Sequence, residues 1–400
     1  MMNNPRQLSG QNLAAALRAS RARTWSLVGD LSDAQWLPPQ QRGVNPIAWE
    51  LAHLAWFAEF WILRGPHGRD ARGFAQAALP PQFVGPDAIF DSAQFAHGQR
   101  WVEKMPTRTQ LRDMMTNQLE ACIASIPNDE NFCNRKECDE AYYFHRLALF
   151  HEDMHGEAFC WLRAALAYSA PAHLLIPTVA VNKPLSVLGG AVDFGFKDSN
   201  EGFAFDNELP AYSATVKDFE IDSAPVSARQ FAQFVDAGGY DNANFWPTQA
   251  GEWRTHSGLS HPQRWRRNQA GEWEMRWFDQ WTLLAQEMPI IHVNAFEAQA
   301  YCLWAKRRLP SAREWEFAAR SCSEFHWGRS VWEWTADAFH GYPGFEPGPY
   351  REYSQPWFGN HRELRGGAFA TDARMHDVRY RNFFEPHRND VFTGFRTVAL

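Results

Sequence analysis

The stretch Phe150-His151-Glu152-Asp153-Met154-His155-Gly156-Glu157 lies inside a segment whose apolar residues recur every three or four positions. That spacing predicts a helix from about Glu137 to Tyr168, which ends before Pro171. Histidines four positions apart project from one face of a helix, about 5–6 Å apart at Cβ, so both imidazoles can reach one metal ion. The stretch therefore predicts a metal site carried by a helix.

The same periodicity predicts long helices nearer the N-terminus, at about Ser9 to Leu31, Asn45 to Arg64 and Arg108 to Ile126. With the segment around His151 they indicate a four-helix bundle. The second of them contains His53 among apolar residues, where an unpartnered imidazole is costly to bury. In a bundle this residue can face the pair on the fourth helix, so His53 is a candidate third ligand, with an ordinary core histidine as the alternative.

The chain changes character after the predicted bundle, residues 1–170. Prolines punctuate the segment 171–184, which we interpret as a linker. Residues 185–400 contain short apolar stretches, many Gly, Pro and Asn, and three predicted helices, at 227–237, 295–305 and 311–319. The second part is thus a loop-rich domain, and the predicted fold class of the whole chain is α+β.

Composition excludes several classes of protein. The net charge of −7 lacks the basic excess of a dedicated nucleic-acid binder. No apolar run approaches the ~20 residues that cross a bilayer, and the N-terminus has no stretch of signal-peptide type. The 6 cysteines contain no CxxC pair and are expected to be reduced thiols. We expect a cytoplasmic protein with neither a nucleic acid nor a membrane as partner.

The motif His151-Glu152-Asp153-Met154-His155 also matches HExxH, the pattern of zinc proteases. A zinc hydrolase would use Glu152 as its general base and would need a third ligand. Glu157 follows His155 by only two positions, so it faces another side of the helix. A zinc hydrolase and a metal-binding recognition module without catalysis both stay open, because imidazole suits zinc as well as iron.

The order of motifs along the chain resembles the ergothioneine sulfoxide synthase (EgtB) family, and within it the selenoneine synthase (SenA) branch. The motifs are His53, the His151 to Glu157 stretch, Asp222-Ser223-Ala224-Pro225-Val226-Ser227, His292-Val293-Asn294-Ala295, Arg308-Leu309-Pro310, Trp332-Glu333-Trp334, Arg365-Gly366-Gly367, Arg381-Asn382-Phe383-Phe384 and Gly394-Phe395-Arg396. The resemblance implies a DinB-like bundle followed by a domain like the formylglycine-generating enzyme, of C-type-lectin-like fold. We expect the three C-terminal motifs around Leu309, Glu333 and Gly366 to be scaffold.

The resemblance also implies a reaction. It implies a mononuclear non-haem Fe(II) held by His53, His151 and His155, and O2-dependent attachment of a chalcogen to the imidazole C2 of hercynine. Tyr350 or Tyr353 would donate a proton in the oxygen chemistry, with Tyr342 as a third candidate. The stretch Asn382, Phe383 and Phe384 would contribute to the hercynine pocket, where aromatic rings suit a trimethylammonium group.

Two departures from the family pattern bear on the chalcogen donor. Phe384 stands where many members have an acidic residue, and the loop from Ile89 to Trp101 is similar to that of the selenoneine branch. An uncharged selenosugar would find hydrogen-bonding or stacking partners there, and the candidate donor-binding residues are Asp91, Ser92, His97, Arg100 and Trp101. The alternative within the family is a C–S bond from γ-glutamylcysteine or cysteine.

Overall fold

The computed structural model describes residues 4–128, 134–174, 176–197 and 201–400. The chain forms two compact units. Unit 1 comprises Met1–Leu162, Lys197–Asp206 and Pro347–Tyr353, and unit 2 comprises Arg163–Phe196, Asn207–Glu346 and Ser354–Leu400. Two short segments from later in the chain therefore belong to the first unit, which the sequence pattern did not indicate.

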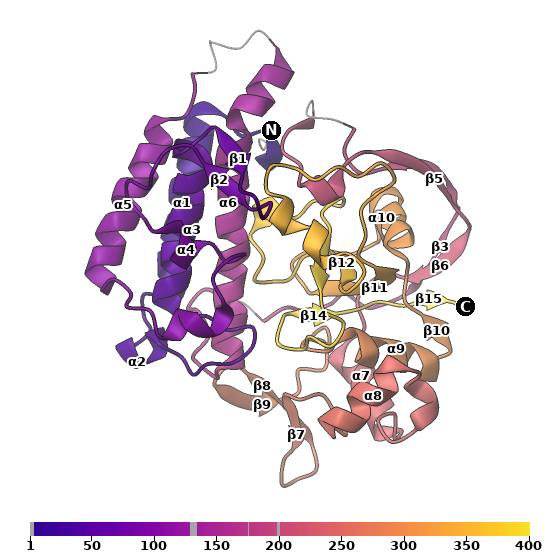
Figure 1. The fold of residues 1–400 in the computed structure, drawn as a ribbon. Coiled ribbons are helices and arrows are strands. Elements are labelled where there is room, and N and C mark those ends of the chain that lie inside the picture. Colours follow the sequence, from indigo (N-terminus) through magenta and orange to yellow (C-terminus); the bar gives the residue numbers. More distant parts are fainter. Residues whose placement is uncertain (1–3, 129–133, 175, 198–200) are drawn as a thin grey trace. The chain divides into compact units, whose positions relative to one another are not determined.

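Long helices build unit 1, as predicted (Figure 1). They are α1 (Gly10–Val28), α3 (Ile47–Leu63), α5 (Arg108–Ala124) and α6 (Arg135–Ala165). Leu17 of α1, Leu119 of α5 and Leu149 of α6 belong to one apolar cluster. A smaller cluster joins α3, α5 and α6 through Ala58, Cys122 and Ala148. The helix α3 is buried on almost every side because its sequence, IAWELAHLAWFAEFWIL, is apolar nearly all round.

Short elements connect these helices. They are the 3-10 turns Pro5–Gln7 and His97–Trp101, the helices α2 (Asp33–Trp36) and α4 (Asp87–Phe90), and the hairpin of β1 (His67–Arg69) with β2 (Ala75–Ala77). The helix α5 begins at a capping box in which Thr107 and Gln110 satisfy each other's backbone N–H groups. Most of the short elements lie between α3 and α5, and they deliver the Phe90 carbonyl and Arg100 to the site described below.

Several small sheets form the β part of unit 2. One has the order β10 (Arg307–Arg308), β15 (Val398–Ala399), β6 (Phe219–Asp222) and β3 (Pro184–Val187). A second has the order β13 (Asn382–Phe384), β12 (Arg362–Gly366), β11 (Trp332–Ala338) and β14 (Thr393–Gly394). The rest are β4 (Gly190–Phe194) with β5 (Tyr212–Val216), and β7 (Trp265–Arg267), β8 (Trp273–Trp277) and β9 (Gln280–Leu283). Mixed with helices, they make the α+β fold.

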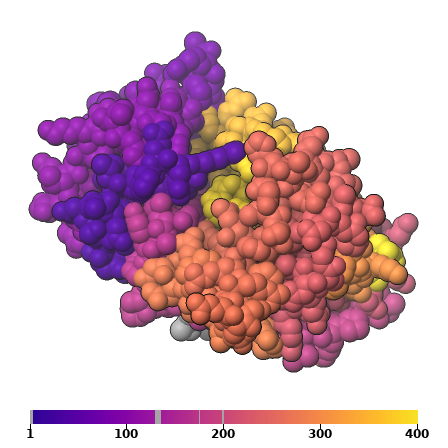
Figure 2. All heavy atoms as spheres, turned by 90° about the horizontal axis from the view of Figure 1, so that it is seen from below, coloured from indigo at the N-terminus to yellow at the C-terminus, as the bar shows by residue number. Residues whose placement is uncertain are grey.

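Unit 2 has the three predicted helices and one that was missed. Capping boxes open α7 (Ala228–Asp236), α9 (Ala295–Trp304) and α10 (Ala312–Ser321). The helix α8 (Gln249–Ser257) has no side-chain cap, and its N-cap residue Thr248 has a φ of 50°. The salmon-to-orange segment that carries α7, α8 and the β7–β8–β9 sheet forms one continuous surface of unit 2 (Figure 2). None of the helices in the described ranges combines the length and apolar character needed to cross a bilayer.

The C-terminal motifs are structural, as expected. Glu333 of Trp-Glu-Trp is fully buried, accepts a hydrogen bond from Trp315 Nε1 at 3.0 Å and forms a buried ion pair with Arg396. Gly366 and Gly367 have φ values of +101° and +141°, a region that side chains disfavour. A Cβ at Gly367 would lie 2.5 Å from His376 Cδ2, so only glycine fits there.

Candidate metal centre

The three predicted histidines come together in unit 1. His53 projects from α3, and His151 and His155 project from one face of α6. One ligand nitrogen from each lies within 4.8 Å of the others. The ring centroids of His53 are 5.1 Å from those of both partners, which are 4.6 Å from each other. The geometry therefore fits three imidazoles that converge on one ion.

Hydrogen bonds orient two of these rings. Nδ1 of His53 lies 2.7 Å from the carbonyl oxygen of Phe90, which can only accept, so Nδ1 carries the proton. Nδ1 of His155 donates to Glu50 Oε1, also at 2.7 Å. Each bond leaves Nε2 with its lone pair available. Partners of this kind fix the tautomer of a metal-binding histidine and make the ligand more basic.

Burial keeps the donor set neutral. His53 and His151 are only 2% and 4% exposed. Burial, and then the neighbouring imidazoles, hold the pKa of both residues well below the usual histidine value. The ring of His151 also stacks on Phe57, with centroids 3.6 Å apart and planes 8° from parallel. Neutral imidazole is the form that binds a metal ion. These two histidines therefore need not lose a proton when a metal ion binds.

A network behind the ligands joins them to the loop after α4. Arg100 Nη1 donates to Asn45 Oδ1 at 2.7 Å, and Asn45 Nδ2 donates to Glu50 Oε2 at 3.2 Å. The Arg100 guanidinium also lies 3.9 Å from the centroid of Trp49, whose ring stacks on His53 with centroids 5.2 Å apart. Burial lowers the pKa of Arg100 to about 10, although the carboxylate of Glu50 acts in the opposite direction. Arg100 thus contacts two ligands indirectly: His155 through Asn45 and Glu50, and His53 through Trp49.

Glu50 was not predicted as a site residue, although the sequence contains a signal for it. Glu50 precedes His53 by three positions and so lies on the same face of α3. It is 2% exposed, which for a carboxylate requires partners. An acid buried one turn before a candidate ligand is a sign of a residue that orients the metal site.

Three acidic residues of α6 near the ligands, Glu152, Asp153 and Glu157, are buried. Both oxygens of Glu152 are held by Arg21 of α1, at 2.7 and 3.1 Å. Asp153 accepts a hydrogen bond from Ser20 Oγ at 2.7 Å. A general base needs an oxygen free to take a proton from water, and the Arg21 guanidinium occupies both. The geometry of Glu152 therefore does not suit the zinc hydrolase reading.

Tyr350 and Tyr353 belong to the segment of unit 1 that comes from late in the chain. Tyr350 packs edge-on against Phe57 at 5.0 Å, and its ring centroid is 6.4 Å from that of His151. No described residue hydrogen-bonds its hydroxyl. Burial, and then nearby carboxylates including Asp91, raise the pKa of Tyr350, so the phenol keeps its proton. Tyr353 instead donates to Met154 Sδ at 3.6 Å. Of the two, Tyr350 has the freer hydroxyl beside a ligand.

The other candidates of the loop have protein partners. Asp91 accepts hydrogen bonds from Ala93 N and Gln94 Nε2, at 2.9 and 2.6 Å. The His97 ring donates to the Val44 carbonyl, and Trp101 Nε1 donates to the Pro38 carbonyl. Ser92 is exposed, and its carbonyl accepts from Arg100 at 3.5 Å. The loop is therefore held in place largely by its own polar groups.

The predicted hercynine residues lie on β13 of unit 2. Asn382 Oδ1 accepts a hydrogen bond from Phe383 N at 2.9 Å. Phe383 stacks on Phe339 with centroids 4.1 Å apart, and the Arg388 guanidinium lies 5.3 Å from the ring of Phe384. Both rings have packing partners within unit 2.

Comparisons with known proteins match both parts of the chain. Residues 176–331 and 330–399 match the model of the sulfatase-modifying factor enzyme 1-like domain, and residues 16–158 match the DinB superfamily. A hercynine oxygenase of Mycobacterium tuberculosis is 29% identical, with 97% of this chain and 98% of that protein aligned. One of Mycolicibacterium thermoresistibile is 27% identical, over 96% and 94%. A formylglycine-generating enzyme of Mus musculus is 28% identical over 44% of this chain and 51% of that enzyme.

These matches agree in order and extent with the helical bundle and the α+β unit that follows. The chain therefore belongs to the sulfatase-modifying factor enzyme 1-like family, with a DinB-superfamily bundle before that domain, and its full-length hercynine oxygenase relatives support the ergothioneine sulfoxide synthase (EgtB) family.

Proposed function

We propose that the protein is an Fe(II)- and O2-dependent enzyme that joins a chalcogen to the imidazole C2 of hercynine, with a selenosugar as the donor. The observation that carries the proposal is the triad of His53, His151 and His155, with two tautomers fixed by hydrogen bonds. Relatives that match over nearly the whole chain and bear the name hercynine oxygenase supply the substrate class.

The donor set fits a mononuclear iron site. Three neutral imidazoles carry no charge, and a metal ion held by three protein ligands has positions left for an imidazole, a chalcogenolate and O2. When bound, ferrous ion would supply the activation of O2. In the overall reaction the C2–H and chalcogen–H bonds break and the carbon–chalcogen bond forms. O2 takes up four electrons when one oxygen atom ends on the chalcogen and the other leaves as water.

The chain's own residues would prepare this chemistry. Glu50 and the Phe90 carbonyl keep Nε2 of two ligands unprotonated, and the aromatic rings of α3 limit the access of water. Tyr350 keeps its proton at neutral pH and can deliver it from Oη, because burial and carboxylates raise its pKa.

The placement of Arg100 favours an uncharged donor. A thiol donor such as γ-glutamylcysteine carries carboxylates, which a free guanidinium would bind. Arg100 is instead half-buried over Trp49 and bonded to Asn45. A selenosugar presents hydroxyl groups and needs no cation. It needs no carboxylate partner either, which agrees with Phe384 at the position where many family members have an acidic residue.

A second candidate is a sulfoxide-forming enzyme that uses γ-glutamylcysteine or cysteine. The name hercynine oxygenase of the full-length relatives favours it, and the chemistry at hercynine would be the same. The two candidates differ only in the chalcogen donor.

The test is aerobic turnover of Fe(II)-loaded protein with hercynine and a selenosugar, γ-glutamylcysteine and cysteine in competition, read by mass spectrometry and an O2 electrode. A C–Se adduct as the main product supports the first candidate, and a sulfoxide supports the second. The controls are Zn(II)-loaded protein and His53→Ala, both expected to be inactive. No adduct and no O2 uptake with any pair would contradict both candidates. A metal-binding recognition module without catalysis would then be the remaining alternative.

A further inference from the structure

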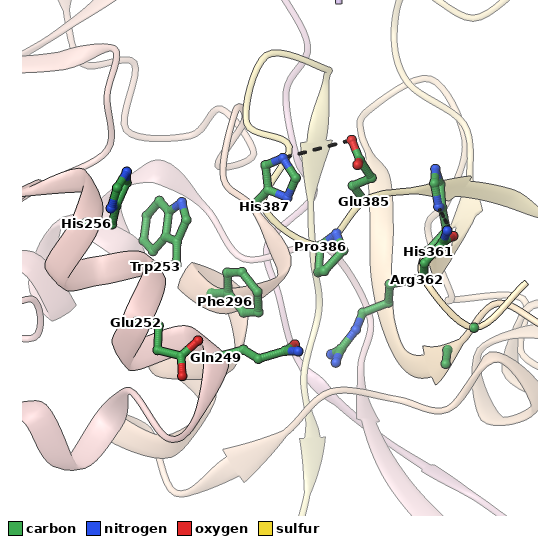
Figure 3. A pocket seen from close by; sticks show the side chains of 13 residues that line it. Gln249, Glu252, Trp253, His256, Phe296, His361, Arg362, Glu385, Pro386 and His387 are labelled. Carbon is green, nitrogen blue, oxygen red and sulfur yellow. Dashed lines mark hydrogen bonds and ion pairs between the residues drawn. The ribbon is translucent and has the colours of Figure 1, made fainter. Parts of the chain in front are cut away.

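Unit 2 contains a cavity of about 860 Å³, which is lined only by residues of that unit (Figure 3). This volume lies in the range of sites that hold small molecules, roughly 300–1,000 Å³. One wall is α8, and the opposite wall consists of the ends of β11 and β12 with the segment that follows β13. The family motifs and the metal chemistry assign no role to this cavity.

The helix α8 presents one face to the cavity. Gln249, Glu252, Trp253 and His256 follow the spacing i, i+3, i+4 and i+7, which brings residues to one side of a helix. Trp253 lies 6.1 Å from Phe296, measured between ring centroids, and we call this pair the aromatic wall. The helix that the sequence analysis missed therefore has a polar and aromatic face turned toward a cavity.

Arg362 is the cation of the opposite wall. It pairs through its backbone with Ala338 and Phe384, so the sheet fixes its position. It is half-buried, yet no group among the described residues accepts a hydrogen bond from its guanidinium. The nearby carboxylate of Asp337 forms no ion pair with it and accepts instead from Ala312 N at 2.6 Å. The guanidinium is therefore available to an acceptor that enters the cavity.

The remaining charges of the cavity leave one anion without a partner. Glu385 Oε2 lies 3.9 Å from His387 Nε2, and His361 Nδ1 bonds to Asn360 Oδ1. The carboxylate of Glu252, at the exposed rim, makes neither an ion pair nor a hydrogen bond with the part of the chain that the structure describes. Figure 3 shows Gln249 between Glu252 and Arg362, with its amide directed toward the guanidinium. The cavity thus offers a cation, Arg362, and an anion, Glu252, with the Gln249 amide between them. The aromatic wall completes its lining.

We propose that this cavity binds a small zwitterion of amino-acid type. Its carboxylate pairs with Arg362 and the Gln249 amide, its ammonium group pairs with Glu252, and its apolar part lies against the aromatic wall. Guanidinium binds carboxylate through two parallel hydrogen bonds, which gives direction as well as strength. A ligand with only one charge would leave either Arg362 or Glu252 unmatched.

The test uses the full chain and three probes that share the benzyl side chain and differ in the charges they carry: L-phenylalanine, N-acetyl-L-phenylalanine without the ammonium charge and L-phenylalaninamide without the carboxylate. Isothermal titration calorimetry is expected to show the zwitterion binding about tenfold more tightly than either analogue, the usual effect of one charge-assisted hydrogen bond. In Arg362→Gln, phenylalanine and its amide should bind equally. In Glu252→Gln, phenylalanine and its N-acetyl derivative should bind equally.

Controls separate this pattern from a loss of structure. Arg266→Gln alters an exposed arginine paired with Glu274, outside the cavity, and should keep the wild-type order of affinities. His53→Ala changes the other unit and should also keep it, with the melting temperature of each variant measured alongside. The proposal is overturned if wild type binds no phenylalanine up to its solubility limit, if the two cavity variants keep the wild-type preferences, or if His53→Ala abolishes binding.

Discussion

His155 must keep one nitrogen free for a metal ion while its ring is held still, and Glu50 serves both needs with a single hydrogen bond of 2.7 Å. The carboxylate is itself held by Asn45 at 3.2 Å. Such a buried acid acts on the metal through the ligand and touches no substrate, so it is a positioning residue. The same logic applies to the Phe90 carbonyl at His53, which no side-chain substitution can remove.

We predict that Glu50→Ala lowers the affinity for Fe(II) about 10- to 100-fold, the usual effect of removing such a partner. Glu50→Gln should recover part of the loss, because its amide oxygen can still accept from Nδ1. Metal affinity is measured by competition with a chelator under anaerobic conditions. Glu120→Gln, in an exposed ion pair with Arg18, is the matched control. Unchanged affinity in Glu50→Ala would contradict the positioning role.

Tyr350 and Tyr353 make a matched pair for a second prediction. Tyr350→Phe keeps the ring against Phe57 and removes only the hydroxyl, so turnover should fall about 100-fold, as for loss of a general acid, with iron content unchanged. Tyr353→Phe removes a weak bond to Met154 Sδ and should change turnover less than threefold, since such a sulfur bond contributes little. The assay is single-turnover kinetics with product detection. The opposite order of effects would transfer the proton-donor role to Tyr353.

At the scale of elements, a buried ion pair ties α1 to α6 next to the metal ligands. Arg21 and Glu152 are 5% exposed each, and Arg21 also donates to the Met115 carbonyl of α5 at 2.6 Å. Glu152 is thus placed to hold the bundle together, although it lies beside His151 in sequence.

Glu152→Ala should therefore destabilise unit 1 by roughly 3–5 kcal/mol, because it leaves Arg21 buried without its partner. The folded fraction should bind iron as wild type does. Urea denaturation followed by circular dichroism measures the first effect, and metal content of the folded protein measures the second. A variant that unfolds like wild type but loses all activity would instead favour a general base at this position.

Another link between elements joins the 3-10 turn His97–Trp101 to α3. Arg100→Gln removes the contact with Trp49 and should cost unit 1 about 1 kcal/mol and increase hydrogen exchange in the turn. Arg112→Gln is the control, since Arg112 lies 4.5 Å from the Trp25 ring in the same way but far along α5 from this network. Equal exchange in the turn of both variants would show that Arg100 does not hold it.

At the scale of the whole molecule, the sequence was sufficient where local periodicity and capping determine structure. Apolar spacing located the bundle helices, and the helices predicted at 227–237, 295–305 and 311–319 are present and begin with capping boxes. The long-range contacts around the metal ligands were not predictable in this way. Arg21 meets Glu152 across 131 positions, and Tyr350 joins the bundle from a distant segment. Such contacts depend on tertiary packing, which a local pattern does not encode.

Glu297 of α9 is a buried carboxyl group on which the stability of unit 2 depends. Burial raises its pKa to about 7, although hydrogen bonds from Tyr240 Oη and Asn294 N act in the opposite direction. Below pH 4.5, the ordinary pKa of a glutamate side chain, the carboxyl group is neutral in both the folded and unfolded chain. Between that pH and about 7 only the unfolded chain ionises, so stability contributed by the neutral form is lost as pH rises.

Glu297→Gln cannot ionise and should not suffer this loss. The free energy of unfolding of wild type relative to the variant should fall by on the order of 3 kcal/mol between pH 4 and pH 8, since one unit of pKa corresponds to 1.36 kcal/mol. Taking the difference between the proteins cancels the other groups that titrate in this range. Denaturant unfolding of the unit 2 transition at several pH values gives the measurement. A difference that is constant with pH would mean that the pKa of Glu297 is the same in the folded and unfolded chain, because the hydrogen bonds from Tyr240 and Asn294 cancel the effect of burial.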